Sequence, residues 1–368
     1  MRYYIIAGEL SGDLHASYLL SELKKQDSDA VFRGFGGEKM ENAGCFIVKS
    51  LKDLAFMGFV EVVTHLKKVL NNIKECKEDI KRFNADAVIL VDYPGFNLRI
   101  AKFVKQLNIP IFYYISPSVW AWKKGRIKTM KRLLTKLYVI LPFEKDFFAQ
   151  NNMEVCYFGN PLVDEIADFR RETTVKINDG KPLIVLMPGS RTQEINKMLP
   201  LQVKIADKYP QYHFAVAAVN THNRSFYEKF TGNRPIDILY NSTYSLLNSA
   251  YAAIVCSGTA TLETALFNVP QIVCYKANIV SWYIGRLVAN VKYISLVNLI
   301  LNRECVVELL QDKCNIRQID TYFQKIVLEE KERIRIHNDY IQLNMLLGKE
   351  DTSKKIANDI YTFLSHKK

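Results

Sequence analysis

Short apolar runs recur along the chain, and most are followed by a small or polar residue and then by a segment with helical spacing. The run at 87–91 contains no polar residue, which is typical of a parallel strand buried on both faces. Regular alternation of strand and helix predicts an α/β chain with open parallel sheets and helices on both faces. We expect strands at 3–7, 30–32, 87–91, 111–115, 137–141, 155–158, 183–187, 213–217, 236–239, 252–256 and 271–275.

The length of 368 residues is sufficient for two domains of ordinary size. The stretch 164–181 loses apolar periodicity and carries mixed charge, so we interpret it as a linker. This divides the chain into a first Rossmann-like domain, 1–163, and a second, 182–347. The remaining segment, 348–368, predicts a helix that packs back on the first domain.

Two strand-to-helix junctions in the second half predict a phosphate-binding site. Gly189-Ser190-Arg191 follows one expected strand, and Ser257-Gly258-Thr259-Ala260 follows another. Backbone N–H groups and the positive dipole end at the start of a helix attract phosphate, and two such points beside Arg191 suit a diphosphate. Each junction alone is equally well explained as an ordinary part of a doubly wound fold. The Walker pattern is absent, which favours a nucleoside diphosphate held as a leaving group over hydrolysis of ATP.

The expected strand ends of the first half carry carboxylates and small residues instead: Glu9, Ser11, Gly12, Asp13, Glu61, Asp92, Asn97 and Ser116. Asp92 ends the most apolar run, where partial desolvation would suit a general base. Its alternative role is to cap the following helix or hold the turn. No dinucleotide fingerprint is present, the single D-x-D at 27–29 falls at the wrong end of a strand, and the histidines lack metal-ligand spacing. We therefore expect neither a metal nor another cofactor.

The formal net charge is +12, and basic residues gather at 123–136 just after Trp120 and Trp122. A solvated helix face, a nucleic acid and an anionic membrane surface are all possible reasons for such a cluster. Apolar residues at helical spacing lie at Val62, Leu66, Val69, Leu70 and Ile73. They predict either a helix packed on the sheet or an apolar surface that touches lipid.

The seven cysteines show no C-x-x-C spacing, which favours free thiols in a reducing compartment. The N-terminus does not have the pattern of a signal peptide, and no apolar run is long enough to span a bilayer. These features predict a cytoplasmic protein.

Taken in order, the motifs make the chain similar to the lipid-A-disaccharide synthase family over nearly its whole length. The block Ser-Pro-Ser-Val-Trp-Ala-Trp at 116–122 is the most specific. The other matching segments are 8–13, 57–62, 92–97, 114–115, 141–144, 188–191, 257–263 and 293–296. Two positions depart from the family pattern: Asn160 stands where a histidine is frequent, and Val297 replaces a proline. No acid–base role is therefore expected at Asn160.

The resemblance implies a GT-B type glycosyltransferase, with two Rossmann-like domains facing a cleft, and an inverting reaction. A UDP-linked 2,3-diacylglucosamine would give its sugar to the 6-hydroxyl of 2,3-diacylglucosamine 1-phosphate, which forms a β-1,6 disaccharide 1-phosphate and releases UDP. Asp92 would be the base. Arg191 and the amides of both junctions would offset the charge of UDP, and Glu263 would accept hydrogen bonds from the ribose.

The resemblance also groups the remaining candidate residues. The donor site would comprise Gly189, Ser190, Arg191, Ser257, Gly258, Thr259, Ala260, Glu263 and Asn298. The acceptor site would comprise Glu9, Ser11, Gly12, Asp13, Met57, Glu61, Asn97, Ser116 and Trp120. A rim facing the anionic inner membrane would comprise Val62, Leu66, Val69, Leu70, Ile73, Lys123, Lys124 and Arg126. The protein would then be cytoplasmic and peripherally attached to that membrane, either as a monomer or as an oligomer.

Two other functions remain open from the sequence. A UDP-N-acetylglucosamine 2-epimerase would use the same two-domain fold and nucleotide loops, but it would need no lipid-facing surface. A basic RNA-binding protein would collect aromatic and basic residues on one exposed face, without carboxylates at the strand ends.

Overall fold

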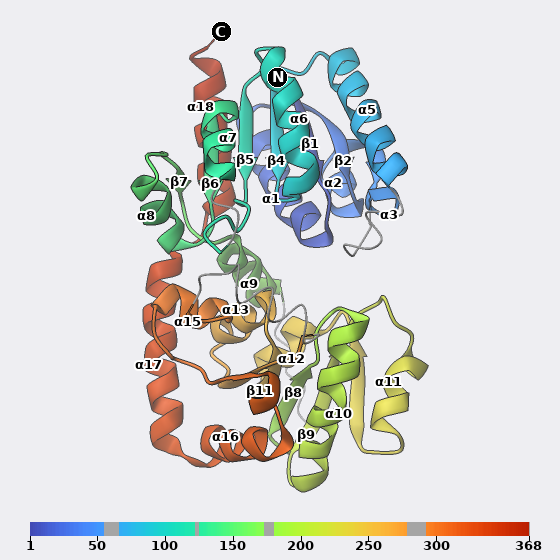
Figure 1. Ribbon diagram of the computed structural model, residues 1–368, viewed down its shortest axis with the longest axis vertical. Helices are drawn as coiled ribbons and strands as arrows, with labels where there is room; N and C mark the ends of the chain where they lie inside the picture. The colour runs from blue at the N-terminus through green and yellow to red at the C-terminus, as the bar shows by residue number, and fades with distance from the viewer. Residues whose placement is uncertain (55–65, 122–124, 173–179, 278–291, 368) are drawn as a thin grey trace. The chain divides into compact units, whose positions relative to one another are not determined.

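The computed structural model describes residues 1–54, 66–121, 125–172, 180–277 and 292–367 (Figure 1). The chain forms two compact units. Met1–Asp164 and Lys349–Lys368 make up the first, and Glu165–Gly348 makes up the second.

The first unit contains a seven-stranded parallel sheet. In chain order its strands are β1 (Arg2–Ala7), β2 (Val31–Gly36), β3 (Cys45–Ser50), β4 (Ala87–Val91), β5 (Ile111–Tyr114), β6 (Lys136–Val139) and β7 (Cys156–Tyr157). Their order in space is β3-β2-β1-β4-β5-β6-β7. The chain therefore winds outward from β1, returns to β4 and winds the other way, which makes the carboxyl ends of β1 and β4 the switch point of this sheet.

Side chains of the first sheet alternate between two cores because successive residues of a strand face opposite sides. Tyr4 and Ile6 belong to a cluster with α5 (Leu66–Phe83), α6 (Pro94–Gln106) and α7 (Arg126–Leu133). Tyr3, Ile5 and Ala7 belong to the other cluster, with α1 (Leu10–Gln26) and α18 (Thr352–Ser365). The last helix of the chain thus covers the same face as the first (Figure 1). The described part of this unit also contains α2 (Glu38–Asn42), α3 (Leu51–Leu54) and α8 (Pro142–Gln150).

The second unit repeats the doubly wound pattern with six parallel strands. They are β8 (Leu183–Met187), β9 (His213–Ala218), β10 (Ile236–Tyr240), β11 (Ala250–Cys256), β12 (Gln271–Tyr275) and β13 (Glu308–Leu310). Their order is β10-β9-β8-β11-β12-β13, so the switch point lies between β8 and β11. Besides most of α9 (Pro161–Glu172), the helices in the described part of this unit are α10 (Thr192–Lys208), α11 (Arg224–Thr231), α12 (Thr243–Ser249), α13 (Thr259–Leu266), α15 (Leu296–Leu301), α16 (Ile316–Leu328) and α17 (Glu330–Leu347), with a short 3-10 helix at Gln311–Lys313.

The predicted fold class, an α/β chain with two Rossmann-like sheets, is confirmed. Two strands were missed, β3 and β13. Helix α9 (Pro161–Glu172) runs through the beginning of the segment that we interpreted as a linker. The next part of that segment, 173–179, lies outside the described residues.

The structure corrects part of the predicted membrane face. Ile73 is only 6% exposed and belongs to the core beneath α5, and Val69 is half-buried against the same core. Leu70, in contrast, is 53% exposed. The helix therefore packs on the sheet through Ile73, and of these three apolar side chains only that of Leu70 is well exposed. Val62, Lys123 and Lys124 and the side chain of Leu66 lie outside the described residues, as do Met57 and Glu61. No helix in the described part of the chain has the length and apolar character needed to cross a bilayer.

Candidate active site

Several of the predicted site residues lie at the switch points of the two sheets. Glu9 follows β1 and Asp92 follows β4 in the first unit. In the second unit, Gly189 to Arg191 follow β8, and Ser257 to Ala260 follow β11. Ligands of open α/β sheets bind outside the carboxyl ends of the strands at such points. Each unit thus presents its polar loops where this fold holds a ligand.

Asp92 lies in a strained turn. Its φ of 45° and that of Tyr93, 46°, are both in the left-handed region, which non-glycine residues rarely adopt. Three hydrogen bonds hold this backbone. The Asp92 N–H donates to the Tyr114 carbonyl at 3.0 Å, and the Asp92 carbonyl accepts from Asn97 Nδ2 at 2.8 Å and from the Tyr113 hydroxyl. Strain that the surroundings enforce in this way is concentrated at functional sites.

The electrostatic surroundings of Asp92 suit a proton acceptor. Burial, and then repulsion from Glu9, raise the pKa of Asp92 from 3.8 to about 6, while a hydrogen bond from the Tyr93 N–H and the electrostatic interaction with His15 lower it. His15 is a buried residue of α1, and its ring lies edge-on to that of Tyr114 at 6.5 Å. A carboxylate with a pKa just below neutrality is mostly deprotonated at neutral pH, and it is a stronger base than an ordinary carboxylate.

Two predicted acceptor residues have structural roles instead. The Asp13 carboxylate is buried and accepts the N–H groups of Gly37 at 2.7 Å, Lys39 at 3.1 Å and Met40 at 3.2 Å, so it caps the start of α2. Asn97 is fully buried, and its Nδ2 donates to backbone carbonyls of the β4 turn. These contacts contradict the expectation that either side chain reaches a substrate directly.

Of the remaining acceptor candidates, Glu9 and Ser11 are exposed at the start of α1, beside the buried Gly12. Ser116 is buried and donates to the Pro117 carbonyl at 3.0 Å. Trp120 is half-buried, with its ring 5.0 Å from that of Phe143 in an edge-on arrangement. Glu9 and Ser11 are therefore the candidates best placed to meet a substrate near Asp92.

Turning to the second unit, the loop after β8 is closed by a residue that the sequence analysis did not single out, Glu194. Its carboxylate accepts the N–H groups of Ser190 at 3.1 Å and Arg191 at 3.2 Å, and it also contacts Arg191 Nη1 at 3.2 Å. This is a capping box at the start of α10. The amides of Ser190 and Arg191 therefore already donate to Glu194, whereas the sequence predicts that the N–H groups of this junction bind phosphate. The sequence Thr-Gln-Glu after Arg191 puts a glutamate at the third helical position, which could have indicated this cap.

The loop after β11 is more open. Helix α13 begins after Gly258, which has no side chain to cap it. The N–H groups of Thr259 and Ala260 belong to the first helical turn, where no partner exists within the helix. Ser257 anchors the loop by donating from Oγ to the Ile294 carbonyl at 3.1 Å. Glu263 is half-buried on the same helix. In this unit, the start of α13 is thus the better phosphate site.

Asn298 does not face a ligand. It is fully buried, and its Nδ2 donates to the Val306 carbonyl at 2.8 Å and to Glu308 at 2.9 Å. Its Oδ1 accepts the N–H groups of Cys305 at 2.8 Å and Val306 at 3.0 Å. All the strong hydrogen-bonding positions of the amide are used, so the predicted donor contact is wrong and Asn298 instead ties α15 to the segment leading into β13.

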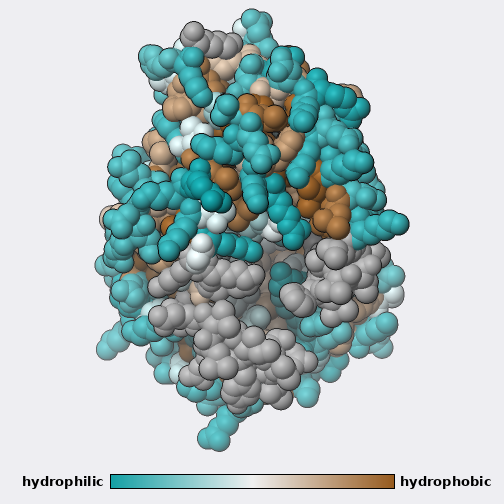
Figure 2. Space-filling model, turned by 45° about the horizontal axis from the view of Figure 1, so that its top comes forward, coloured by the Kyte–Doolittle hydropathy of each residue, from teal (hydrophilic) through white to brown (hydrophobic). Residues whose placement is uncertain are grey.

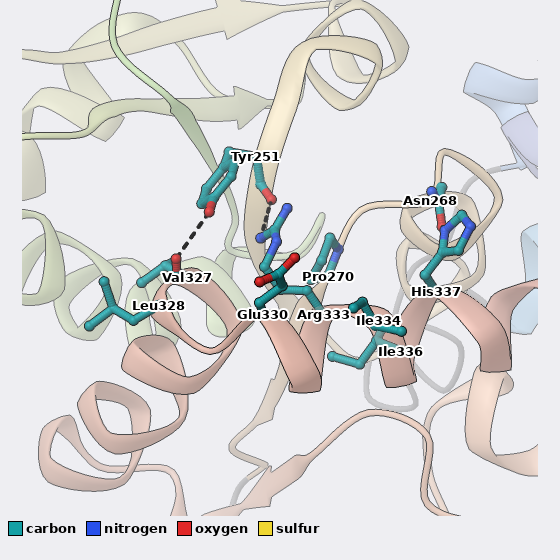
Figure 3. Close-up of a pocket in the computed structure, with 10 residues that line it drawn as sticks. All are labelled: Tyr251, Asn268, Pro270, Val327, Leu328, Glu330, Arg333, Ile334, Ile336 and His337. Atoms are coloured by element: carbon teal, nitrogen blue, oxygen red, sulfur yellow. Dashed lines mark hydrogen bonds between the residues drawn. The ribbon is translucent and has the colours of Figure 1, made fainter.

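A cavity of about 390 Å³ lies away from these loops, beside the amino ends of β11 and β12 and against α17 (Figure 3). Its wall includes Tyr251, whose ring lies 3.9 Å from the Arg333 guanidinium, and Arg333 donates to the Tyr251 carbonyl at 3.2 Å. Parallel strands present their ligand sites at the carboxyl ends, so this cavity is not the nucleotide site. In the parts of the chain that the structure describes, no group of three or more His, Cys, Asp or Glu residues could hold a metal ion.

Comparison with known proteins agrees with this geometry. Residues 3–360 match the family model described as lipid-A-disaccharide synthetase. A lipid-A-disaccharide synthase of Syntrophus aciditrophicus is 34% identical, over 96% of this chain and 95% of the relative. One from Myxococcus xanthus is 31% identical, over 99% and 97%.

Solved structures share the fold at low sequence identity. Staphylococcus aureus MnaA with UDP superposes with a TM-score of 0.73 at 12% identity, covering 99% of this chain and 97% of that one. The glycosyltransferase of kitacinnamycin gives a TM-score of 0.69 at 11% identity, covering 99% of both. A UDP-GlcNAc 2-epimerase of Neisseria meningitidis gives 0.66 at 12% identity, covering 98% of this chain and all of that one. These likenesses establish the GT-B fold, whereas the match over residues 3–360 and the relatives above 30% identity show that the chain belongs to the lipid-A-disaccharide synthetase family.

Proposed function

We propose that this glycosyltransferase moves 2,3-diacylglucosamine from UDP to the 6-hydroxyl of 2,3-diacylglucosamine 1-phosphate. The observation that carries the proposal for this chain is Asp92, a carboxylate with a pKa of about 6 held in a strained turn at the switch point of the first sheet. Family membership over residues 3–360 supplies the reaction class, and Asp92 supplies the base that the reaction needs.

The transfer is a single displacement. Asp92 takes the proton of the acceptor hydroxyl as its oxygen bonds to C1 of the donor sugar, and the bond from C1 to the UDP oxygen breaks on the opposite face. The configuration at C1 inverts to β. Arg191 and the first-turn amides of α13 offset the charge that develops on UDP, and preorganised donors of this kind stabilise a departing anion. UDP is therefore a substrate fragment, and the proposal includes no metal.

The two alternative functions receive weaker support. Epimerases resemble the chain at 11–15% identity, which reflects the shared fold. Curated relatives at 31–34% identity carry the synthase name. An RNA-binding protein would not require a proton-accepting carboxylate at a switch point.

We place the membrane contact on the basic face of the first unit, defined as the outer surface of α5, α6 and α7. Its exposed cations are Lys67, Lys68, Lys74, Lys81, Arg82, Arg99, Lys102, Lys105, Lys128, Lys131 and Arg132, and Arg126 is half-buried among them. Figure 2 shows a surface on which hydrophilic side chains predominate, with apolar residues visible between them. Each such cation near an anionic bilayer contributes about 1 kcal/mol of attraction, which salt screens. A diacylated substrate in the inner leaflet would be reached from the cytoplasm by this route.

The test is an assay of UDP release from UDP-2,3-diacylglucosamine, with and without the diacylated acceptor. We expect release that depends on the acceptor and that persists in EDTA. Release at the same rate without acceptor, or conversion of UDP-N-acetylglucosamine to its 2-epimer, would contradict the proposal.

A further inference from the structure

The Glu194 carboxylate occupies the turn that was predicted to hold phosphate after β8. One of its oxygens accepts the N–H groups of Ser190 and Arg191, at 3.1 and 3.2 Å, and the other lies 3.2 Å from Arg191 Nη1. The Arg191 side chain is 74% exposed, whereas that of Glu194 is only 17% exposed. The guanidinium that would meet a diphosphate is therefore held by a carboxylate of its own helix.

The turn is shaped around this carboxylate. Gly189 has a φ of 105°, and a Cβ at that position would lie 2.6 Å from a Glu194 carboxylate oxygen and 2.7 Å from Glu194 Cβ. On another side, the same Cβ would lie 3.3 Å from the sulfur of Cys256 at the end of β11. Only glycine therefore leaves room for Glu194 to reach the two amides, and the contact is a built part of the loop.

We infer that Glu194 is a positioning residue that competes with the diphosphate of the donor for Arg191 and the two amides, and so controls how tightly UDP is held and how fast it leaves. This inference rests on the proposed donor site. Carboxylate and phosphate oxygens bind the same charge-assisted donors, so the two anions cannot both occupy them. Two negative charges that share Arg191 also repel each other.

Such competition has a consequence for turnover. Contacts that hold the UDP group equally tightly in the substrate and in the transition state lower KM without raising kcat. After the sugar has been transferred, the Glu194 carboxylate can bind Arg191 again. This weakens the binding of UDP and favours its release. The N–H groups at the start of α13 remain available to the phosphates throughout.

Glu194→Gln tests this role because glutamine also completes a capping box at this position. The variant keeps the turn but removes the charge. We expect UDP to bind on the order of tenfold more tightly by calorimetry, as expected when a nearby like charge is removed. KM for the donor should fall with it, while kcat should not rise. Uridine, which carries no phosphate, should bind as it does to the unchanged protein.

Two comparisons make the outcome specific. Glu330→Gln makes the same charge change in the first turn of α17. Glu330 lines the cavity beside the amino ends of β11 and β12 (Figure 3), so this variant should leave UDP affinity unchanged. The ratio of UDP affinity to uridine affinity, measured on one sample, is unaffected if part of a variant is unfolded. An unchanged or lower ratio in Glu194→Gln would overturn the inference and leave Glu194 as a helix cap. Failure of the unchanged protein to bind UDP would instead refute the proposed donor site.

Discussion

At the scale of single residues, Asp92 is the group on which the proposed chemistry depends. Its backbone is fixed by the Tyr114 carbonyl, the Tyr113 hydroxyl and the Asn97 amide. Its side chain is left to accept a proton. The strain of two consecutive left-handed residues, roughly 1–3 kcal/mol for each, is retained because these contacts enforce it.

Asp92→Asn should reduce kcat by about 100-fold or more, the usual effect of losing a general base, and leave UDP affinity unchanged. The amide has nearly the same shape, so the turn should persist and the melting temperature should not fall. Turnover is measured as UDP release and affinity by calorimetry. A variant with near-normal kcat would remove Asp92 from the mechanism and direct attention to Glu9.

Glu9→Gln should shift the acid limb of the pH–rate profile. Activity of the unchanged protein should fall as the pH drops through about 6, because Asp92 then holds a proton. Burial is the largest cause of the raised pKa and repulsion from Glu9 the second, so removing the Glu9 charge should move the limb to lower pH without abolishing it. A limb that stays in place would show that Glu9 does not act on the base.

The same pKa shift affects stability with a definite sign. The folded pKa of Asp92, about 6, lies above the ordinary value of 3.8. Asp92 therefore favours the fold below about pH 3.8, and this contribution is lost as the pH rises through about 6. Because asparagine does not titrate, Asp92→Asn should not lose this stability as the pH rises. The melting temperatures of the two proteins should therefore differ more at pH 7 than at pH 4. A difference independent of pH would contradict the assignment.

Some polar residues could not be assigned correctly from the sequence. Asp13, Asn97 and Asn298 stand at positions where a ligand contact and a buried anchor give the same pattern. The deciding fact is which backbone groups face the side chain after folding. Asn298 meets two N–H groups and a carbonyl, and Asp13 meets three N–H groups. Glu194 was missed for a different reason. Its position three residues after Arg191 is an ordinary helix-capping pattern, yet its carboxylate lies in the predicted phosphate site.

At the scale of helices and strands, continuous apolar runs identified the central strands correctly. The strand β4, for example, was predicted with its observed bounds. The missed strand β3 lies at the sheet edge and is mostly half-buried, and β13 contains only three residues. β3 does contain a four-residue apolar run at 45–48, so this strand could have been predicted from the sequence, whereas β13 is too short to provide such a run.

Helix α5 provides a matched pair of changes. Ile73→Ser should lower the free energy of unfolding by about 2–5 kcal/mol, because Ile73 fills the core beneath the helix. Leu70→Ser should change it by less than about 0.5 kcal/mol, because Leu70 is exposed. Only Leu70→Ser should weaken binding to anionic vesicles while the protein remains folded, as measured by co-sedimentation. Full vesicle binding by Leu70→Ser would exclude α5 from the membrane contact.

At the scale of the whole molecule, the first unit is completed by the end of the chain. Ile356, Ile360 and Leu364 of α18 are buried in its core, and Asp359 accepts hydrogen bonds from Lys136 at 2.8 Å and Tyr138 at 2.7 Å. A chain ending at Gly348 should therefore melt its first unit at lower temperature and lose transfer, yet still bind UDP through the second unit. Asp359→Asn, which keeps the apolar contacts, should have the smaller effect. An unchanged calorimetric melt of the shortened chain would contradict the assignment of α18 to the core of the first unit.

The configuration of the product shows whether transfer is a single displacement with Asp92 as its base. The unchanged protein is incubated with UDP-2,3-diacylglucosamine and the diacylated 1-phosphate acceptor, and the product is isolated and examined by NMR. We expect a β-1,6 disaccharide 1-phosphate, whose new anomeric proton has the large coupling of a diaxial pair, formed in an amount equal to the UDP released. An α linkage, or UDP released without any disaccharide, would contradict a single displacement with Asp92 as its base.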